Sequence, residues 1–411
     1  MTSIPGLGRI PEAWDTQRAK WLMNRERRST STADQVVTAF RDGTVTLRLN
    51  RRLDGFTEAL QEIGYQGIRK GDLVVHSMDG FAGAIGISDS DGKASPVVHT
   101  YTPASQADLR YYAYTLRQMA LNGHITSLAK GIRERSTAFD VPMLANLLLP
   151  HPPLEEQRRI ADFLDAETAR LDQLANNYSK LKALFIERHQ RVIDSNFEPI
   201  EDTTIPLKYV VRFIEGPGIM AEDFRPSGVP LIRVRGLKDG EVTLTGCNHL
   251  DATMVAKRWS KFALRIGDRV ISGSATMGEV SSVTSPEVVG AIPYTGLIIL
   301  RPTSSAVDMN YVEHFLQSST FFKQIDALKA GAAMQHFGPT HLAQIRMPLP
   351  EVTTQLQISE EAKRATSQMQ RMRDFVDRQL ALLAERRQAL ITAAVTGQFD
   401  VSTASGRGVT E

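Results

Sequence analysis

The residues that could perform chemistry are few, and none of them completes a catalytic set. Gly80, Gly83 and Gly86 are spaced like a cofactor-binding loop, but a strand followed by a turn explains them better. Gly92-Lys93-Ala94 lacks the Ser or Thr of a phosphate-binding loop. His151-Pro152-Pro153-Leu154 lacks the amide or acid, and also the aromatic, of the Asn/Asp-Pro-Pro-aromatic motif of amino-methyltransferases. We therefore expect no catalytic and no cofactor-binding residues.

Metal ligands are equally sparse. His336 and His341 are five residues apart and no third ligand stands near them, whereas a zinc site needs at least three protein ligands. Cys247 is the only cysteine, which excludes disulfides and thiolate clusters within the chain. We expect no metal site.

Polar residues after two similar strands could instead touch another molecule. Ser77 and Met78 follow the strand-like stretch GDLVV, and Ser274 and Thr276 follow the similar stretch GDRVI. Both sets sit where a loop could approach the edges of nucleic-acid bases, although a plain turn explains them equally well. Further along, a glutamine can pair with adenine through two hydrogen bonds, which makes Gln335 and the adjacent His336 candidates as well.

Basic residues gather in both halves of the chain. Such groups neutralise phosphates and make binding weaken as salt rises, although many basic clusters are ordinary solvated surfaces. The net charge of +2 decides little, because a near-neutral total can hide a basic face. The candidates for phosphate contact are Arg25, Arg27, Arg28, Arg48, Arg51, Arg52, Arg69 and Lys70 in the first half, and Arg233, Arg235, Lys238, Lys257, Arg258 and Lys261 in the second.

These residues must be positioned by the elements around them, and the longest predicted element lies between Leu154 and Asn196. Two prolines precede it and two acids occupy its first turn, as is typical of a helix N-terminus. Apolar residues then recur at spacings of four and three, the period of a heptad seam. The seam comprises Ile160, Leu164, Glu167, Leu171, Leu174, Tyr178, Leu181, Phe185, Arg188 and Val192.

A copy of this helix is predicted near the C-terminus. ERHQRVI at 187–193 matches ERRQALI at 385–391, an offset of 385 − 187 = 198. The same offset, without a gap, places Gln157 on Gln355 and predicts two helices of equal length. The second seam comprises Ile358, Ala362, Ala365, Met369, Met372, Val376, Gln379, Leu383, Arg386 and Leu390.

Arg188 and Arg386 occupy the same position of the two seams. Each arginine either extends past the apolar stripe to water or pairs with an acid, such as Glu167, across an antiparallel partner helix. We favour pairing that fixes the register of the helices.

The segments between the helices also repeat. GDLVV at 71–75 corresponds to GDRVI at 267–271, with an offset of 196, and Phe139 corresponds to Phe337. The fold class is therefore predicted to be α+β, with two mixed α/β domains in tandem and two long helices that pack as an antiparallel coiled coil. The predicted segments are a first domain at 1–150, a helix at 151–198, a second domain at 199–350, a helix at 351–397 and a flexible tail at 398–411.

Length and composition agree with this organisation. At 411 residues the chain exceeds one ordinary core, since a domain has about 150 residues. No apolar run approaches the roughly 18 to 20 residues that span a bilayer, and the N-terminus lacks a signal-peptide core. We expect a cytoplasmic protein.

Two similar domains joined by equal helices suggest a ligand with two similar sites a fixed distance apart, and duplex DNA has that geometry. A second interpretation is a structural adaptor whose coiled coil joins two protein-binding domains. A salt-dependent, sequence-selective shift of a DNA duplex separates the two.

Several motifs together resemble one family. GDLVVHSMDGFAGAIGIS followed by SPVVHTY, PHPPLEEQRRIADFLD at the first helix, LIRVRGLKDGEV, and MPLPEVTTQLQI into a helix ending in TAAVTGQF are similar to specificity subunits of type I restriction-modification systems. The resemblance covers nearly the whole chain. The second junction departs from the pattern, because Glu351-Val352-Thr353-Thr354-Gln355 replaces the proline-leucine-glutamate run.

The resemblance implies a non-catalytic, DNA-reading subunit. Each domain would be a target recognition domain for one half of a bipartite DNA site, and the antiparallel helices would set the gap between the halves. Two adenine methyltransferase subunits would dock on the chain, and restriction and translocase subunits would join them. S-adenosylmethionine, ATP and magnesium would be bound by those partner subunits.

Overall fold

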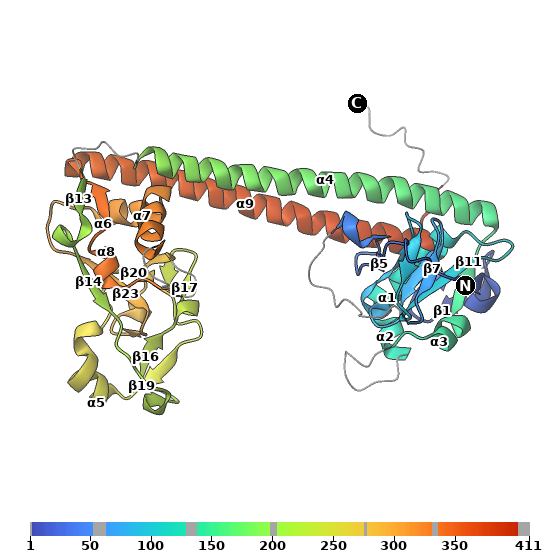
Figure 1. Cartoon of the computed structure of the whole chain (residues 1–411), viewed down its shortest axis with the longest axis horizontal. Helices are drawn as coiled ribbons and strands as arrows, with labels where there is room; N and C mark the ends of the chain where they lie inside the picture. Colours follow the sequence, from blue (N-terminus) through green and yellow to red (C-terminus); the bar gives the residue numbers. More distant parts are fainter. Residues whose placement is uncertain are drawn as a thin grey trace. The chain divides into compact units, whose positions relative to one another are not determined.

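Two compact units make up the chain. The computed structural model describes residues 2–51, 63–128, 138–197, 204–274, 278–330 and 336–401. Unit 1 contains Met1–Tyr178 and Arg378–Glu411, and unit 2 contains Ser179–Asp377. The divisions between the units fall inside the two longest helices, α4 (Leu154–Ser195) and α9 (Val352–Val395) (Figure 1). Each unit therefore consists of one mixed domain and a part of both helices.

The domain of unit 1 is built on a four-stranded antiparallel sheet in the order β4-β11-β8-β9. Its strands are β4 (Met23–Glu26), β11 (Val98–Pro103), β8 (Leu73–His76) and β9 (Ile85–Ile87). Apolar clusters cover both faces: Leu73 and Val75 belong to the main core, whereas Val74 belongs to a smaller one. Residues of β8 therefore alternate between two cores, which explains the nearly continuous apolar run of GDLVV.

Shorter elements surround this sheet. The helices of the domain are α1 (Leu109–Leu121), α2 (His124–Leu128) and α3 (Val141–Asn146). Its other strands are β1 (Thr2–Ile4), β2 (Gly8–Ile10), β3 (Asp15–Arg18), β5 (Val37–Ala39), β6 (Val45–Leu47), β7 (Gln66–Ile68), β10 (Gly92–Ala94) and β12 (Leu148–His151).

Helix α1 carries much of the unit 1 core. The Asp108 carboxylate caps its N-terminus by accepting a hydrogen bond from the Arg110 N–H at 2.9 Å. Tyr111, Tyr112 and Leu116 are fully buried, and burying one large apolar side chain stabilises a fold by about 1.5–3 kcal/mol. The same core receives Ile160 and Leu164 from α4 and Ile391 from α9, so the helices are anchored in the domain.

Unit 2 has a six-stranded sheet in the order β14-β23-β20-β21-β18-β17 and a four-stranded sheet in the order β15-β19-β16-β22. The helices of its domain are α5 (Ala252–Met254), α6 (Met309–Leu316), α7 (Ser319–Ala330) and α8 (Pro339–Leu342). Its strands are β13 (Thr204–Pro206), β14 (Val211–Glu215), β15 (Phe224–Arg225), β16 (Val229–Ile232), β17 (Leu237–Lys238), β18 (Glu241–Val242), β19 (Asn248–Leu250), β20 (Arg269–Ser272), β21 (Val280–Ser282), β22 (Ile292–Pro293), β23 (Leu297–Pro302) and β24 (Arg346–Pro348).

The two domains share their central strand pairings. Strand β11 pairs antiparallel with β4 and β8, and β23 pairs antiparallel with β14 and β20. Pro103 lies opposite Met23 in unit 1, and Pro302 lies opposite Val211 in unit 2. This register makes each residue of β4 equivalent to the residue of β14 that is 188 positions later.

Within each unit, α4 and α9 run antiparallel. In unit 1 the Arg387 guanidinium contacts Asp172, and the rings of Phe163 and Phe399 lie 5.5 Å apart. Numbers therefore rise along α4 as they fall along its partner. The same order holds in unit 2, where Lys182 Nζ lies 2.5 Å from Asp377 and His189 Nε2 lies 3.0 Å from the Thr366 hydroxyl. The predicted fold class is confirmed.

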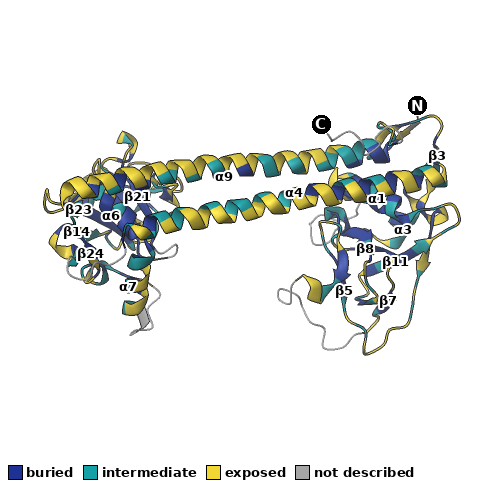
Figure 2. Ribbon diagram, turned by 90° about the horizontal axis from the view of Figure 1, so that it is seen from above, coloured by how far each residue is buried: buried dark blue, intermediate teal, exposed yellow. Residues whose placement is uncertain are grey.

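The seam residues differ widely in burial, as Figure 2 shows along both helices. Ile160 and Leu164 are buried where α4 packs on the unit 1 core, but Val376, midway along α9, is buried as well. Ile160, Leu164, Leu171, Ala362 and Val376 are buried, Leu181, Phe185, Met369, Met372 and Leu383 are partly buried, and Leu174 is 40% exposed.

Arg188 and Arg386 are exposed rather than placed in the seam. The register pairing favoured for them is wrong, since Glu167 lies 3.9 Å from Arg170 of its own helix and Arg387 makes the contact to Asp172. The physical reason is the helical period. Residues 387, 391, 394 and 395 share one face, which turns residue 386 outward by about 100°.

Candidate nucleic-acid interface

One end of the unit 1 sheet gathers several of the candidate residues. Strand β11 is antiparallel to β4 and β8, so its first residues meet the last residues of both neighbours. The Ser77 N–H donates to the Val97 carbonyl at 2.8 Å, and the Phe139 N–H donates to the Ser77 carbonyl at 2.8 Å. Ser77 is therefore buried and fixed by its backbone, whereas the next residue, Met78, is 37% exposed.

Exposed side chains of mixed chemistry surround this point. We call Arg25, Arg27, Met78, Val97 and His99 the loop-end patch. Arg25 and Arg27 are exposed, Val97 is 39% exposed and His99 is half-buried. The patch thus combines cationic and apolar groups, which are the groups that read base edges and thymine methyls in DNA grooves.

His99 sits beside the Arg25 guanidinium. Arg25 Nη2 lies 3.4 Å from His99 Nδ1, the long limit of a hydrogen bond. Burial, reinforced by the positive charge of Arg25, lowers the pKa of His99 to about 4. The imidazole is therefore neutral near pH 7, and its Nδ1 can accept a hydrogen bond from the guanidinium.

The turn that carries Met78 is held by polar contacts that the sequence analysis missed. The Asp79 N–H donates to His76 Nδ1 at 3.1 Å, and the Asp79 carboxylate lies 2.7 Å from Arg41 Nη2. His99 and Arg41 were not predicted as site residues either. His99 lies inside a strand pattern and Arg41 is far from Asp79 in the sequence, so no local pattern indicated them.

The equivalent end of unit 2 has the same backbone contacts. The Gly273 N–H donates to the Gly296 carbonyl at 2.8 Å, and the Phe337 N–H donates to the Gly273 carbonyl at 2.9 Å. These bonds repeat those of Ser77.

The side chains at this end of unit 2 are different. By strand register, Phe213 replaces Arg25, Glu215 replaces Arg27 and Ile298 replaces His99. The Glu215 carboxylate accepts a hydrogen bond from the Gly296 N–H at 3.4 Å. The framework is therefore the same, but the charge is reversed only where Glu215 replaces Arg27, and the other two positions become apolar in unit 2.

Two arginines proposed for phosphate contact are instead committed within unit 1. Arg28 forms two hydrogen bonds with Asp72, whose side chain is only 5% exposed, and this partner raises the pKa of Arg28. A buried carboxylate needs such a counter-charge. Arg51 lies 2.5 Å from Asp42 and 4.5 Å from the Phe40 ring. Both arginines are therefore paired with a carboxylate inside unit 1, and their contact with phosphates stays a prediction.

The basic candidates of unit 2 lie on other elements. Arg233 stacks 4.0 Å from the Tyr294 ring and lies 3.3 Å from the Asn248 amide oxygen, so it supports the small sheet. Its neighbours are more available. Arg235, Lys238, Lys257 and Arg258 are exposed, the last two on the five-residue π-helix η8 (Val255–Trp259).

The remaining candidates divide into two groups. Ser274, the counterpart of Met78, is partly buried, and His336 is exposed just before Phe337. Arg52, Thr276 and Gln335 lie outside the described residues. Contact between any of these residues and DNA stays a prediction.

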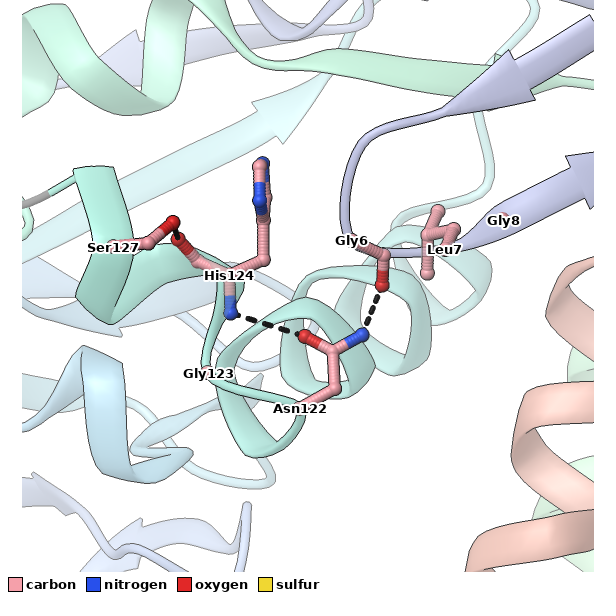
Figure 3. Close-up of a pocket in the computed structure, with 7 residues that line it drawn as sticks. All are labelled: Gly6, Leu7, Gly8, Asn122, Gly123, His124 and Ser127. Carbon is pink, nitrogen blue, oxygen red and sulfur yellow. Dashed lines mark hydrogen bonds between the residues drawn. The ribbon is translucent and has the colours of Figure 1, made fainter.

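A surface hollow with a volume of about 460 Å³ lies between the β1–β2 turn and the end of α1 (Figure 3). Its polar groups bond to one another. The Asn122 side chain donates to the Gly6 carbonyl and accepts from the His124 N–H at 3.1 Å, and the Ser127 hydroxyl donates to the His124 carbonyl at 2.7 Å. This arrangement resembles a braced turn more than a site for chemistry.

In the described ranges, no group of three His, Cys, Asp or Glu side chains is placed to hold a metal ion. Across the same ranges, every helix is too short or too polar to cross a membrane.

Comparisons with known proteins identify relatives by sequence. The chain is 25% identical over 203 residues to the type I restriction enzyme StySPI specificity subunit of Salmonella potsdam, covering 47% of this chain and 42% of that protein. It is 24% identical over 244 residues to the MjaVIII specificity subunit of Methanocaldococcus jannaschii, covering 54% and 56%. The matches thus span about half the length of these relatives. No family model matches the chain.

Solved structures share the fold. A structure described for complex assembly and conformational transition of the type I R-M system aligns with a TM-score of 0.74 at 18% identity, covering 95% of this chain and 99% of that one. The HsdS subunit of Thermoanaerobacter tengcongensis aligns with a TM-score of 0.54 at 19% identity, covering 95% and 98%. By sequence, the chain is therefore similar to type I restriction enzyme specificity subunits over about half of its length, and it shares the fold of these two solved structures.

Proposed function

We propose that the chain is the DNA sequence-recognition subunit of a type I restriction-modification complex. Each unit reads one half of a bipartite site, and the two half-sites have different sequences. The chain itself catalyses neither methyl transfer nor DNA cleavage in this proposal.

One observation carries it: the two units repeat a framework and differ in the side chains which that framework presents. Ser77 and Gly273 make the same pair of backbone hydrogen bonds, while Arg25 and Arg27 of unit 1 are replaced by Phe213 and Glu215 in unit 2. A repeated scaffold with altered surface chemistry suits two ligands of one kind that differ in detail, as two DNA half-sites do.

The helices have a separate part in the proposal. Helix α4 has 42 residues and α9 has 44, so each is about 65 Å long. We propose that this pair sets the gap between the half-sites and docks two adenine methyltransferase subunits. Restriction and translocase subunits join that complex, which works in the cytoplasm. The partners bind S-adenosylmethionine, ATP and magnesium.

The decisive experiment uses the chain co-expressed with its methyltransferase subunits. Methylated adenines are mapped in the host genome, and binding of duplexes that contain the mapped site is measured at several salt concentrations. A bipartite methylated motif, bound selectively and more weakly as salt rises, supports the proposal. Methyl transfer by the pure chain alone contradicts it.

Exchange of a domain tests whether each unit reads independently. Residues 1–150 are replaced by the matching domain of a relative, and the methylated motif is mapped again. One half of the motif should change while the other half stays the same. A change in both halves would show that the units do not read separately.

The second candidate function is a structural adaptor whose helices join two protein-binding domains. The large exposed parts of α4 and α9 favour it only weakly, because the proposed complex also uses them. An adaptor would leave the methylome unchanged when the loop-end patch is mutated.

A further inference from the structure

The internal repeat separates residues that hold the fold from residues that vary with the ligand. Asp72 and Asp268 are equivalent, both are buried, and each bonds to an arginine: Arg28 in one case and Arg301 in the other. The buried pair is thus kept, although Arg28 follows the end of β4 and Arg301 lies on β23. At the equivalent end of the sheet the units differ: the exposed Arg25 and half-buried His99 of unit 1 correspond to Phe213 and Ile298, which pack in the core of unit 2.

Arg25 is placed to reach outward. It lies on β4, opposite Tyr101 of β11, and is exposed although its strand belongs to the central sheet. Within the described residues, no carboxylate lies within ion-pair distance of its guanidinium, whereas Arg28 and Arg51 each have one. Its recorded partner is the neutral nitrogen of His99, at 3.4 Å.

We propose that Arg25 contacts a base, a guanine, in the half-site read by unit 1, and that His99 is a positioning residue which holds the guanidinium for that contact. The inference rests on the proposed DNA-reading function. Arg25 and His99 would then be residues that determine specificity, which the proposed function alone does not name.

The chemistry of the guanidinium supports a base contact. Arginine has five N–H donors in a fixed fork, and guanine offers O6 and N7 as paired acceptors in the major groove. One N–H directed at His99 Nδ1 leaves the others free to form the two parallel bonds. A neutral imidazole fixes the side chain without cancelling its charge, whereas a carboxylate would compete with the base.

The surroundings also favour a base over a phosphate. Met78 and Val97 are exposed apolar residues at the same end of the sheet. Apolar groups gain little beside a phosphate, but they pack well against base edges and the thymine methyl. Arg27, also exposed there, supplies the charge for a backbone contact.

The test uses the complex with its methyltransferase subunits and duplexes in which each base pair of the mapped site is changed singly. Arg25→Gln should lower the preference for G·C at one position of the unit 1 half-site by about 10- to 100-fold and leave the other half-site unchanged. Lys20→Gln is the matched control, because it removes an exposed charge at the other end of β4 and should leave every preference intact.

His99 variants separate positioning from folding. His99→Leu removes the acceptor and should relax the preference at the same base pair as Arg25→Gln. His99→Asn keeps an acceptor oxygen and should retain most of it. Loss of binding by both variants at every base pair would assign His99 a structural role and overturn its part of the inference.

The outcomes distinguish this inference from the proposed function. If the wild-type complex binds no sequence selectively, the proposed function fails. If it is selective but Arg25→Gln weakens binding equally on all duplexes and reduces the salt slope by about one, Arg25 contacts a phosphate and the inference fails alone.

Discussion

Gln157 and Gln355 make the same hydrogen bonds at the start of the two long helices. Each side chain is fully buried. The Gln157 amide oxygen accepts from the Asp108 N–H at 2.9 Å, and its nitrogen donates to the Pro152 carbonyl at 2.8 Å. Gln355 makes these bonds with Asp308 at 2.9 Å and Pro350 at 2.8 Å. Each glutamine ties a long helix to the aspartate that caps a helix of its own domain, since Asp108 caps α1 and Asp308 caps α6.

Gln157→Leu should destabilise unit 1 by about 1–3 kcal/mol, because it leaves a buried N–H and a buried carbonyl without partners. Hydrogen exchange resolved by peptide is the measurement, since a two-unit chain need not unfold in one step. Exchange should rise in α1 and stay unchanged in α6.

Gln355→Leu should give the opposite pattern, with faster exchange in α6 alone. Gln173→Leu is the control, because Gln173 is exposed on α4. Equal effects of Gln157→Leu on both units would show that the junction is not local to its own domain.

The helices and the tandem repeat were accessible from sequence because they depend on local period and self-similarity. The offset of 198 between Gln157 and Gln355 needs no structure. Helix bounds were also close, since the helix predicted at 151–198 is α4 at Leu154–Ser195.

The candidate site was less accessible, because it depends on pairings between distant strands. The contact between Arg25 and His99 joins residues 74 positions apart, and that between Arg28 and Asp72 joins residues 44 apart. No local sequence pattern distinguishes Arg28, which is paired with Asp72, from Arg25, which is exposed. The predicted seam is wrong at Arg386 for a related reason. A shift of one residue along a helix replaces a position that faces the partner helix with one that faces solvent.

Reversal of charge tests the observed register of the helices in unit 1. Arg387→Glu places two carboxylates together and should lower stability by less than about 1 kcal/mol, because the Arg387 and Asp172 side chains are 31% and 51% exposed. The double variant with Asp172→Arg should restore it. Thermal unfolding at low salt is the measurement.

The neighbouring residue provides the control. Arg386→Glu should change stability by less than about 0.5 kcal/mol, because that side chain is exposed. A larger effect from Arg386→Glu than from Arg387→Glu would contradict the register described here.

Acid should lower the stability of unit 1, in part because His99 becomes protonated. The pKa of this side chain is lowered from 6.5 to about 4 by burial and by Arg25, so the unfolded state binds more protons between those values. Stability therefore falls as pH falls through this window and is unaffected above it. Arg27 and His76 oppose protonation of His99, and Asp140 favours it.

The contribution of His99 is isolated by comparing wild type with His99→Asn. The variant should lose less stability than wild type between pH 7 and about pH 4, as measured by urea unfolding at each pH. Other histidines with lowered pKa values, such as His314, remain in both proteins and cancel in the difference. Parallel curves for the two proteins would show that His99 is not held neutral by the fold.

The proposed gap-setting role of the helices predicts the effect of inserted residues. The extra residues are inserted after Tyr178 in α4 and after Asp377 in α9. The boundary between the two units lies at these positions, so each unit keeps its own packing. Both helices must be lengthened together, because α4 and α9 pack against each other in antiparallel orientation within each unit. Four residues add about 6 Å and turn a helix by about 40° beyond a full turn.

Such a step is close to two base pairs of B-DNA at about 3.4 Å each. The two half-site sequences should therefore stay the same while the gap between them lengthens by one or two base pairs, as read by methylome sequencing. Two inserted residues add only about 3 Å and turn the helices by about 200°, which should abolish methylation because the seam faces no longer meet. A four-residue variant that methylates with an unchanged gap would show that these helices do not set it.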